Sequence, residues 1–364
     1  MPKFIPGLQL NEEFFHEIVR PLMDQHFPNL MYSAGLVGHG SDVTGLDSSS
    51  SIDHDWGPHL HLFFPERNFE KNKRAVNRML RKHLPYSYKG YSTNFVETGG
   101  YLKHIPKLKK RGPVNHLFLF WTVPSFFKHY LGFDIRKKPT YKDWLTFPQQ
   151  ALLEVTGGKV YHDELGLEKM RSSFDYFPDD VWKYLMTAQW GRIADIHQLP
   201  ARTGYRADEV GSMIATAKAV QHVVFLAYLL ERHYMPYAKW LGIMFRRRLP
   251  IASKMYPLLE KILHERSWRT RQRLLARAYQ VLGEMHNKLK ITRPLSTRII
   301  PFPGRGYPII KVELFIKALE NSVKNKRLKM KNFKYPLGSV DQFLDHARIN
   351  QINYVYRELR DIIK

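Results

Sequence analysis

The sequence contains no cysteine among its 364 residues. This absence excludes a disulfide framework, a thiolate metal site and a cysteine nucleophile. The first residues, MPKFIPGLQLNEEFF, contain no long apolar stretch, so we expect no signal peptide. No uncharged apolar run approaches the roughly 20 residues that a membrane-spanning helix needs. We therefore expect a cytoplasmic protein that does not enter a membrane.

Acidic residues are scarce relative to basic ones, with 33 Asp and Glu against 57 Lys and Arg, and the formal net charge is +24. Such a surplus attracts polyanions, which include nucleotides, nucleic acid and acidic membrane surfaces. Surface lysines also serve solubility, and this explanation of the charge is equally good. The hydrophobic content of 44% indicates a folded globular protein.

Strand and helix patterns alternate over the first 140 residues. A helix is expected at 10–26, where Asn11 could act as its N-cap. Short apolar runs predict four strands, at 31–37, 52–64, 86–96 and 115–123. Further helices are expected at 66–83 and 125–133, and Gly132 is a plausible C-cap for the second of these.

Strand signals almost vanish after Trp144, apart from a short one at 159–161. Helical periodicity dominates instead, at 181–197, 208–234, 251–264, 267–288, 311–322 and 339–361. The sequence therefore predicts an α+β protein. Its domain 1–142 contains a small mixed sheet with helices, and an all-α helical domain follows at 143–364.

The candidate site lies between Met31 and Phe64. An apolar strand leads into Gly40-Ser41, and eleven residues later Asp53-His54-Asp55 opens the next predicted strand. On an extended strand both carboxylates project from one face, where they could hold divalent metal against a triphosphate. Gly40 lets a phosphate approach the backbone closely. Taken alone, a D-x-D pattern is more often a solvated turn.

The combined pattern resembles the signature of the DNA polymerase beta-like nucleotidyltransferase superfamily. GSDVTGLDSSSSIDHDWGP is similar to a bacterial group of uncharacterised nucleotidyltransferase-like proteins, held as a domain of unknown function. NHLFLFWTVPSFFKHYLGFD, FPDDVWKYLMTAQWGRIA and LLERHYMPYAKWLG resemble the same group. The resemblance implies a nucleotidyltransferase domain and a helical domain, arranged as in aminoglycoside and lincosamide nucleotidyltransferases. It implies that Gly40 and Ser41 contact triphosphate and that Asp53 and Asp55 bind Mg²⁺ or Mn²⁺.

The superfamily usually has a third carboxylate on a later strand, but Phe118 stands at that place here. Glu97 is the nearby substitute, and an exposed charge at a strand end explains it equally well. His59 and His61 share the alternation of the two aspartates, provided that Gly57-Pro58 does not shift the register. They could touch phosphate or ligate metal, whereas His54 has the opposite parity and is expected to be packed.

The helical domain adds one candidate. Lys239 could contact a phosphate as a point charge, with Tyr237 or Trp240 stacking on a base. A packing motif with a snorkelling lysine is the alternative. The basic stretches at 246–248 and 266–280 could bind a polyanion or form solvated helix faces.

Two functional hypotheses follow. In the first, the protein transfers a nucleoside monophosphate from a nucleoside triphosphate to a hydroxyl acceptor, which could be a small molecule, a protein or RNA. In the second, the scaffold is catalytically inactive and binds nucleotide or RNA through its basic surface. Similar two-domain enzymes are sometimes homodimers, and the sequence leaves the oligomeric state open.

Overall fold

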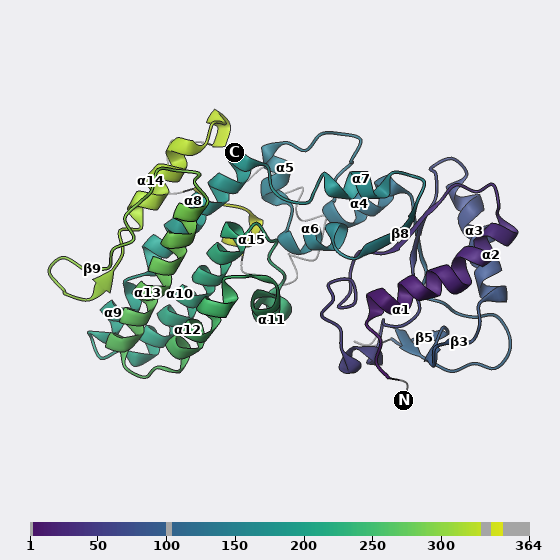
Figure 1. Cartoon of the computed structure of the whole chain (residues 1–364), viewed down its shortest axis with the longest axis horizontal. Helices are drawn as coiled ribbons and strands as arrows, with labels where there is room; N and C mark the ends of the chain where they lie inside the picture. Colours follow the sequence, from purple (N-terminus) through teal and green to yellow (C-terminus); the bar gives the residue numbers. More distant parts are fainter. Residues whose placement is uncertain (1–2, 100–103, 329–335, 345–364) are drawn as a thin grey trace. The chain divides into compact units, whose positions relative to one another are not determined.

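The computed structural model describes residues 3–99, 104–328 and 336–344. The chain forms two compact units, drawn in Figure 1. The first contains residues 1–138 and 151–175, and the second contains residues 139–150 and 176–364. The predicted boundary between residues 142 and 143 falls inside helix α5 (Tyr141–Thr146), which belongs to the second unit.

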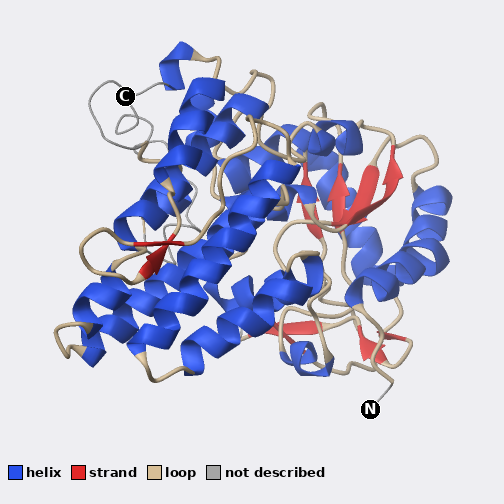
Figure 2. Cartoon of the chain, turned by 60° about the vertical axis from the view of Figure 1, so that its left-hand side comes forward, coloured by secondary structure: helices blue, strands red, loops and turns tan. Residues whose placement is uncertain are grey.

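A four-stranded sheet is central to the first unit, in the order β7-β2-β1-β8 (Figure 2). Its strands are β1 (Ser33–Leu36), β2 (His61–Phe63), β7 (Leu119–Trp121) and β8 (Lys159–Asp163). β1 is antiparallel to β2 and β8, while β2 is parallel to β7. Every residue of β1 and β2 is buried, because helices and loops cover the sheet. The predicted α+β class with a small mixed sheet is confirmed.

Helices of the first unit pack against this sheet. They are α1 (Gly7–Phe14), the π-helical turn η1 (Phe15–Val19), α2 (Arg20–His26), α3 (Phe69–His83), α4 (Val123–Leu131) and α7 (Leu167–Ser172). Leu10, Phe14 and Leu80 are fully buried members of one hydrophobic core. Gly132 ends α4 in the left-handed conformation at φ 62°, as predicted.

The helix expected at 10–26 starts earlier, after Pro6, so the prediction that Asn11 caps it is wrong. Asn11 is buried inside α1 instead. Its Nδ2 donates to the carbonyl oxygens of Gly7 and Gly57, and its Oδ1 accepts from the backbone N–H of His59 at 2.7 Å. The side chain therefore fastens α1 to the segment that leads into β2.

The prediction of one strand at 86–96 is also wrong, because this segment contains three short strands. The chain reverses at Lys89 and Gly90, both at positive φ, and forms a hairpin of β3 (Ser87–Tyr88) and β4 (Tyr91–Ser92). β5 (Phe95–Glu97) then pairs antiparallel with β6 (His104–Pro106). Among the described residues, the strands of these two ribbons are not hydrogen-bonded to the four-stranded sheet.

The second unit is largely helical, as predicted. Besides α5 it contains α8 (Asp179–Ile196), α9 (Leu199–Gly204), α10 (Glu209–Leu230), α11 (Ala238–Arg248), α12 (Ala252–His264), α13 (Trp268–Lys288), α14 (Glu313–Ser322), the 3₁₀ turn η3 (Lys326–Leu328) and α15 (Val340–Phe343). A two-residue ribbon pairs β9 (Ile300–Pro301) with β10 (Pro308–Ile309). The helix α6 (Gln149–Thr156) contains one of the three points at which the chain passes between the units. Of the helix predicted at 339–361, residues 345–361 lie outside the described residues.

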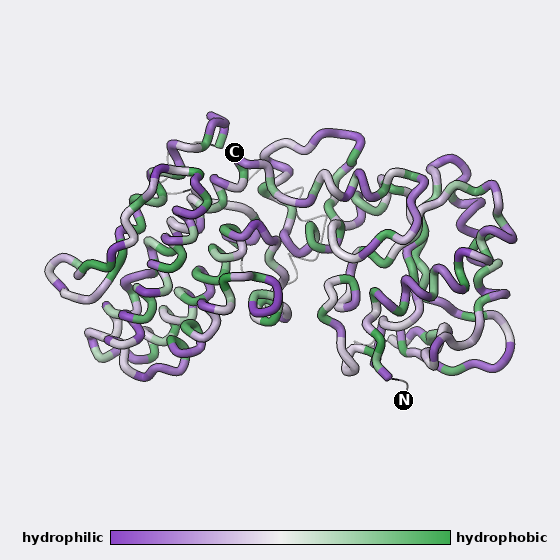
Figure 3. The backbone as a smooth tube through the Cα atoms, viewed as in Figure 1, coloured by the Kyte–Doolittle hydropathy of each residue, from purple (hydrophilic) through white to green (hydrophobic). Residues whose placement is uncertain are grey.

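The core of the second unit lies where α10 contacts α8, α9 and α13. Figure 3 shows hydrophilic and hydrophobic residues alternating along these helices. Trp190 of α8 is fully buried and stacks on Phe315 of α14 at a centroid distance of 4.5 Å. Among the described residues, α10 alone has the length and apolar composition of a membrane span, and 61% of its most apolar window is buried in the protein. Its contacts make it the core helix of this unit.

Candidate functional site

The Gly40-Ser41 segment lies in a tight turn that follows the buried strand β1. The Leu46 N–H donates to the Ser41 carbonyl oxygen at 2.8 Å, and the Thr44 hydroxyl donates to the same oxygen at 3.0 Å. Gly40 adopts φ +148°, and a Cβ atom there would lie 2.2 Å from Asp42 Oδ1. The turn therefore requires glycine at this position. No helix begins at Ser41, whose surroundings are turn residues.

Gly38 anchors the start of the same turn. It adopts φ +88°, and a Cβ atom there would lie 2.3 Å from the Tyr130 hydroxyl oxygen. That hydroxyl also accepts the His39 N–H at 3.3 Å. The turn is thus fitted closely onto α4.

We expect Gly38→Ala to destabilise the first unit by about 1–3 kcal/mol, because it adds backbone strain and a clash with Tyr130. Gly166→Ala is the matched control, since Gly166 has φ +70° but nothing within 4 Å of the position of its Cβ. Urea denaturation of both variants measures the difference. Equal losses of stability would show that the Tyr130 contact contributes nothing.

A buried carboxylate, Asp42, lies under the turn, and no sequence pattern distinguishes it from other loop aspartates. Its Oδ1 accepts the Val43 N–H, and its Oδ2 lies 3.7 Å from His59 Nε2. Burial raises the pKa of Asp42 above its ordinary value, although the nearby His59 opposes this shift. Asp42 therefore belongs to the interior that supports the turn.

His59 and His61 are both buried. The Nδ1 of His59 lies 2.9 Å from the Gly57 carbonyl oxygen. His61 lies on β2 near Trp121 and Phe126, and burial lowers its pKa to about 3, helped by His59 and His129. His61 is consequently neutral at pH 7. Within the described part of the chain, no group of three or more His, Asp or Glu side chains is arranged to hold a metal ion.

Asp53 and Asp55 do not lie on a strand, so the prediction that they share one strand face is wrong. Asp53 ends a 3₁₀ helix, η2 (Ser49–Asp53), whose first turn is closed by a capping box between Ser48 and Ser51. Asp55 has φ +48°, and β2 begins only at His61. The register that was to align His59 and His61 with these aspartates is therefore lost.

Each aspartate has a histidine partner. Asp53 Oδ1 lies 2.9 Å from the Nδ1 of His54, so His54 is paired with an acid. Asp55 Oδ1 lies 2.6 Å from the Nδ1 of His104, and the Asp55 N–H donates to the His104 carbonyl oxygen at 2.9 Å. The side chains of Asp53 and Asp55 are 55% and 42% exposed, so both carboxylates are open to solvent.

Glu97 lies directly opposite His104 in the β5–β6 pairing. Side chains at directly opposed positions of a ribbon lie on one face, with Cβ atoms about 4.5–5.5 Å apart. His104 therefore lies between two acids: it contacts Asp55, and it is paired with Glu97 across the ribbon. Glu97 is exposed. Phe118 is 5% exposed and packs near Phe14, so its position offers no carboxylate and no solvent access.

Lys239 belongs to the second unit, at the start of α11. It is exposed, and its Nζ lies 4.7 Å from the centroid of the Trp240 ring. The backbone N–H of Tyr237 donates to Gln150 Oε1 at 3.0 Å, which fixes the segment before α11. A role for Lys239 at a phosphate stays a prediction.

Residues 144–241 match a domain of unknown function, DUF4037. The DUF4037 segment runs from α5 to the start of α11 and includes two of the pieces on which the resemblance was based, around residues 177–194 and 229–241. The turn at Gly40-Ser41 and both aspartates lie outside it.

No curated protein matches the chain. The crystal structure of a nucleotidyltransferase-like protein from Exiguobacterium sibiricum 255-15 is similar at a TM-score of 0.34 and 10% sequence identity, over 96% of this chain and 90% of that one. A similarity of this size carries no argument about function.

Proposed function

We propose that the protein is a nucleotidyltransferase that moves a nucleoside monophosphate from a nucleoside triphosphate to a hydroxyl acceptor. The observation that supports it best is the order of parts along the chain. A buried strand enters a glycine-dependent turn, and two solvent-exposed aspartates follow within fifteen residues. Backbone N–H groups of a turn and the Ser41 hydroxyl suit phosphate oxygens.

We assign the magnesium or manganese ion of the proposed reaction to Asp53 and Asp55. Mg²⁺ in phosphate chemistry is usually held by one or two carboxylates, with phosphate oxygens and waters completing its shell. Asp53 and Asp55 supply two exposed carboxylates, and their histidine partners orient them. When bound, such an ion would neutralise charge on the triphosphate.

The remaining groups have roles in the proposed reaction. The acceptor oxygen forms a bond to the α-phosphorus, the bond from that phosphorus to the pyrophosphate oxygen breaks, and the acceptor proton passes to a base. Glu97 is the carboxylate next to the Asp55–His104 pair, and we assign it this proton. Gly40 and Ser41 are assigned to the triphosphate.

The experiment is a transfer assay with α-labelled nucleoside triphosphates, Mg²⁺ or Mn²⁺, and a panel of hydroxyl acceptors that includes RNA and the protein itself. We expect metal-dependent label transfer and equimolar release of pyrophosphate. Glu97→Gln should lower the rate constant of transfer about 10²-fold or more with little change in triphosphate affinity. Exposed Glu168→Gln is its control. Absence of transfer to every acceptor would contradict the proposal.

A second candidate function, binding of RNA by an inactive scaffold, is favoured by one basic surface of the first unit. The C-terminal part of α3, Tyr86 and the Gly112-Pro113 segment line a hollow of about 500 Å³. Its lining contains three cations, one tyrosine and no acid: Arg78, Arg81, Lys82, Tyr86, Gly112 and Pro113. Cationic side chains beside an aromatic ring suit the phosphates and bases of a single strand.

Salt dependence tests this second candidate. Binding of a labelled single-stranded RNA, followed by fluorescence anisotropy between about 50 and 200 mM KCl, should weaken steeply with salt. Arg78→Glu/Arg81→Glu should reduce the affinity about tenfold or more, whereas Lys311→Glu/Lys317→Glu, an equal charge change in the second unit, should not. An affinity that salt leaves unchanged would exclude this function.

A further inference from the structure

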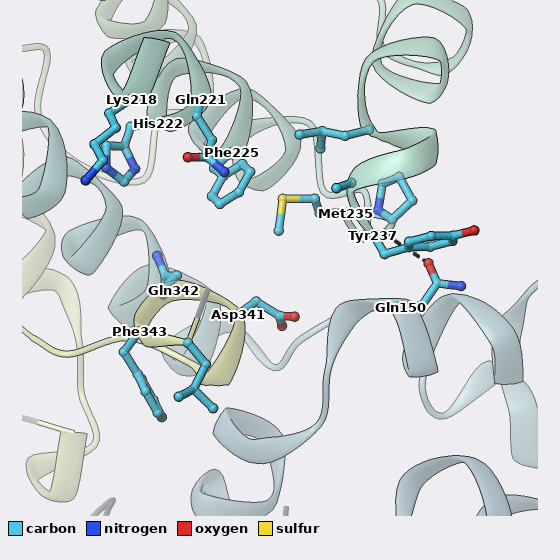
Figure 4. Close-up of a pocket in the computed structure, with 14 residues that line it drawn as sticks. Gln150, Lys218, Gln221, His222, Phe225, Met235, Tyr237, Asp341, Gln342 and Phe343 are labelled. Carbon is cyan, nitrogen blue, oxygen red and sulfur yellow. Dashed lines mark hydrogen bonds between the residues drawn. The ribbon is translucent and has the colours of Figure 1, made fainter. Parts of the chain in front are cut away.

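A pocket of about 250 Å³ lies within the second unit (Figure 4). Four segments form it: Gln150 of α6, the middle of α10, residues 235–241 before and within α11, and residues 341–344 of and after α15. Most of its lining residues fall inside the DUF4037 segment. Its volume lies just below the range of about 300–1,000 Å³ that is usual for ligand sites, so it suits a small organic molecule.

Hydrogen bonds from α6 hold two sides of the pocket together. Gln149 Oε1 accepts the Met235 N–H at 2.9 Å, and Gln150 Oε1 accepts the Tyr237 N–H at 3.0 Å. Asp341 Oδ2 accepts the Gln149 N–H at 3.0 Å. The walls are therefore fixed before any ligand arrives, which reduces the entropy cost of binding.

Asp341 supplies the acidic group of the pocket. Figure 4 shows its carboxylate pointing toward the side that carries Gln150 and Tyr237. Burial raises the pKa of Asp341 to about 7, and the influences that oppose this shift are hydrogen bonds from Gln149 and from the Asp341 backbone, with no cationic side chain among them. One carboxylate oxygen caps α6, and among the described residues that line the cavity Lys218 is the cationic side chain.

His222 is fixed as a hydrogen-bond donor on another wall. Gln342 Nε2 donates to Gln189 Oε1, and Gln189 Nε2 lies 3.2 Å from the Nδ1 of His222. An amide N–H can only donate, so Nδ1 accepts and the ring proton lies on Nε2. Burial, together with Arg192 and Lys218, lowers the pKa of His222 to about 4, so the ring is neutral at pH 7.

The rest of the lining is mainly apolar and aromatic. Phe225, Met235, Tyr237, Leu241 and Phe343 contribute it. Lys218 is exposed, and Figure 4 draws it beside His222 on α10, apart from Asp341. An apolar body with one positive charge therefore matches the pocket better than an anion does.

We propose that this pocket binds a small organic amine whose ammonium group pairs with Asp341 and whose apolar or aromatic body lies between Phe225, Met235 and Tyr237. A bound ammonium would place a positive charge beside the buried carboxylate, and aromatic faces favour cations. The proposal is independent of nucleotide transfer, because it uses none of the residues assigned to that reaction.

Isothermal titration of the full-length protein tests the proposal with 2-phenylethylamine as the probe and the neutral 2-phenylethanol as its matched analogue. We expect saturable binding of the amine, at least about tenfold tighter than that of the alcohol. Asp341→Asn keeps an oxygen to cap α6 and removes the charge, so it should reduce amine affinity to the level of the alcohol. Asp195→Asn, an exposed acid of α8, should leave both affinities unchanged.

The pH dependence of the wild-type protein gives a second test that needs no variant. Amine affinity should fall about fivefold or more between pH 8 and pH 6, as Asp341 takes up a proton, while alcohol affinity stays constant. His222 does not titrate in this range, and Lys218 and Tyr237 are the other ionisable side chains of the lining. Equal affinities for amine and alcohol, absence of saturable amine binding, or an Asp341→Asn variant that binds amine like the wild type would overturn the proposal.

Discussion

Replacing Asp53 and Asp55 together by alanine should lower nucleotide transfer by at least about 10²-fold. The two side chains are the only carboxylates assigned to metal in the proposed reaction, and both are exposed. Their loss leaves the triphosphate charge without a bound cation at this site. The rate of label transfer at saturating metal is the quantity to measure.

The fold should survive this double substitution. Surface ion pairs contribute about 0–1 kcal/mol each, and both aspartates make only such pairs, with His54 and His104. The matched control is Asp24→Ala/Asp175→Ala, which removes two exposed acids of the same unit. The control should transfer label like the wild type. Transfer that persists in Asp53→Ala/Asp55→Ala would contradict the roles assigned to these residues.

Lowering the pH from 7 to 5 should remove the stability that buried, neutral histidines contribute to both units, against a smaller opposing gain from the buried acids Asp42 and Asp341, whose pKa values are raised. His61 and His286 are almost fully buried, and burial lowers their pKa values to about 3 and about 4. His116 and His222 are shifted in the same direction, each to about 4. A histidine that is held neutral in the folded protein contributes stability above its unfolded pKa near 6.5, and this contribution is lost as the pH falls.

At pH 5 each of these four histidines should lower the free energy of unfolding by about 1–2 kcal/mol. Together these losses are a large share of a total stability of about 5–15 kcal/mol. Urea denaturation at pH 7 and pH 5, followed by tryptophan fluorescence, measures the loss. His61→Phe removes one titrating group among aromatic neighbours. The free energy of unfolding of this variant should therefore fall less between pH 7 and pH 5 than that of the wild type. The quantity compared is the change in unfolding free energy between the two pH values, because any packing cost of the substitution is the same at both and cancels. An unchanged pH difference in this variant would contradict a neutral, buried His61.

The predictable part of the fold came from hydrophobic periodicity. The helices around 69–83, 179–196, 209–230 and 268–288 follow it closely, since long amphipathic or buried helices leave a repeated signal in the sequence. The left-handed Gly132 after α4 was likewise predictable, because glycine there carries no steric penalty.

The D-x-D segment shows where local signals misled. A strand was expected from residue 52, but Ser48 and Ser51 cap each other and start a 3₁₀ turn that ends at Asp53. Gly57 at φ +142° and Pro58 then delay the strand to His61. The Ser-x-x-Ser spacing is a local capping signal that could have indicated the turn.

The partners of the site could not be predicted from sequence. His104 contacts Asp55 across 49 residues, and this pairing depends on the β5–β6 ribbon. Asp42 resembles any loop aspartate until the fold buries it beside His59. Asn11 was predicted to be the N-cap of a helix, but its side-chain amide joins α1 to Gly57 and His59 instead. Each contact joins segments that no periodic pattern relates.

The most direct test of the central claim is the affinity for a nucleoside triphosphate with and without Mg²⁺. Isothermal titration of the full-length protein with a non-hydrolysable ATP analogue, and with the corresponding GTP, CTP and UTP analogues, supplies it. We predict that at least one analogue binds, that removing Mg²⁺ with EDTA weakens binding about tenfold or more, and that Asp55→Asn abolishes this metal dependence. Triphosphate binding that is equally tight without Mg²⁺, or a metal dependence that Asp55→Asn leaves intact, would contradict the account.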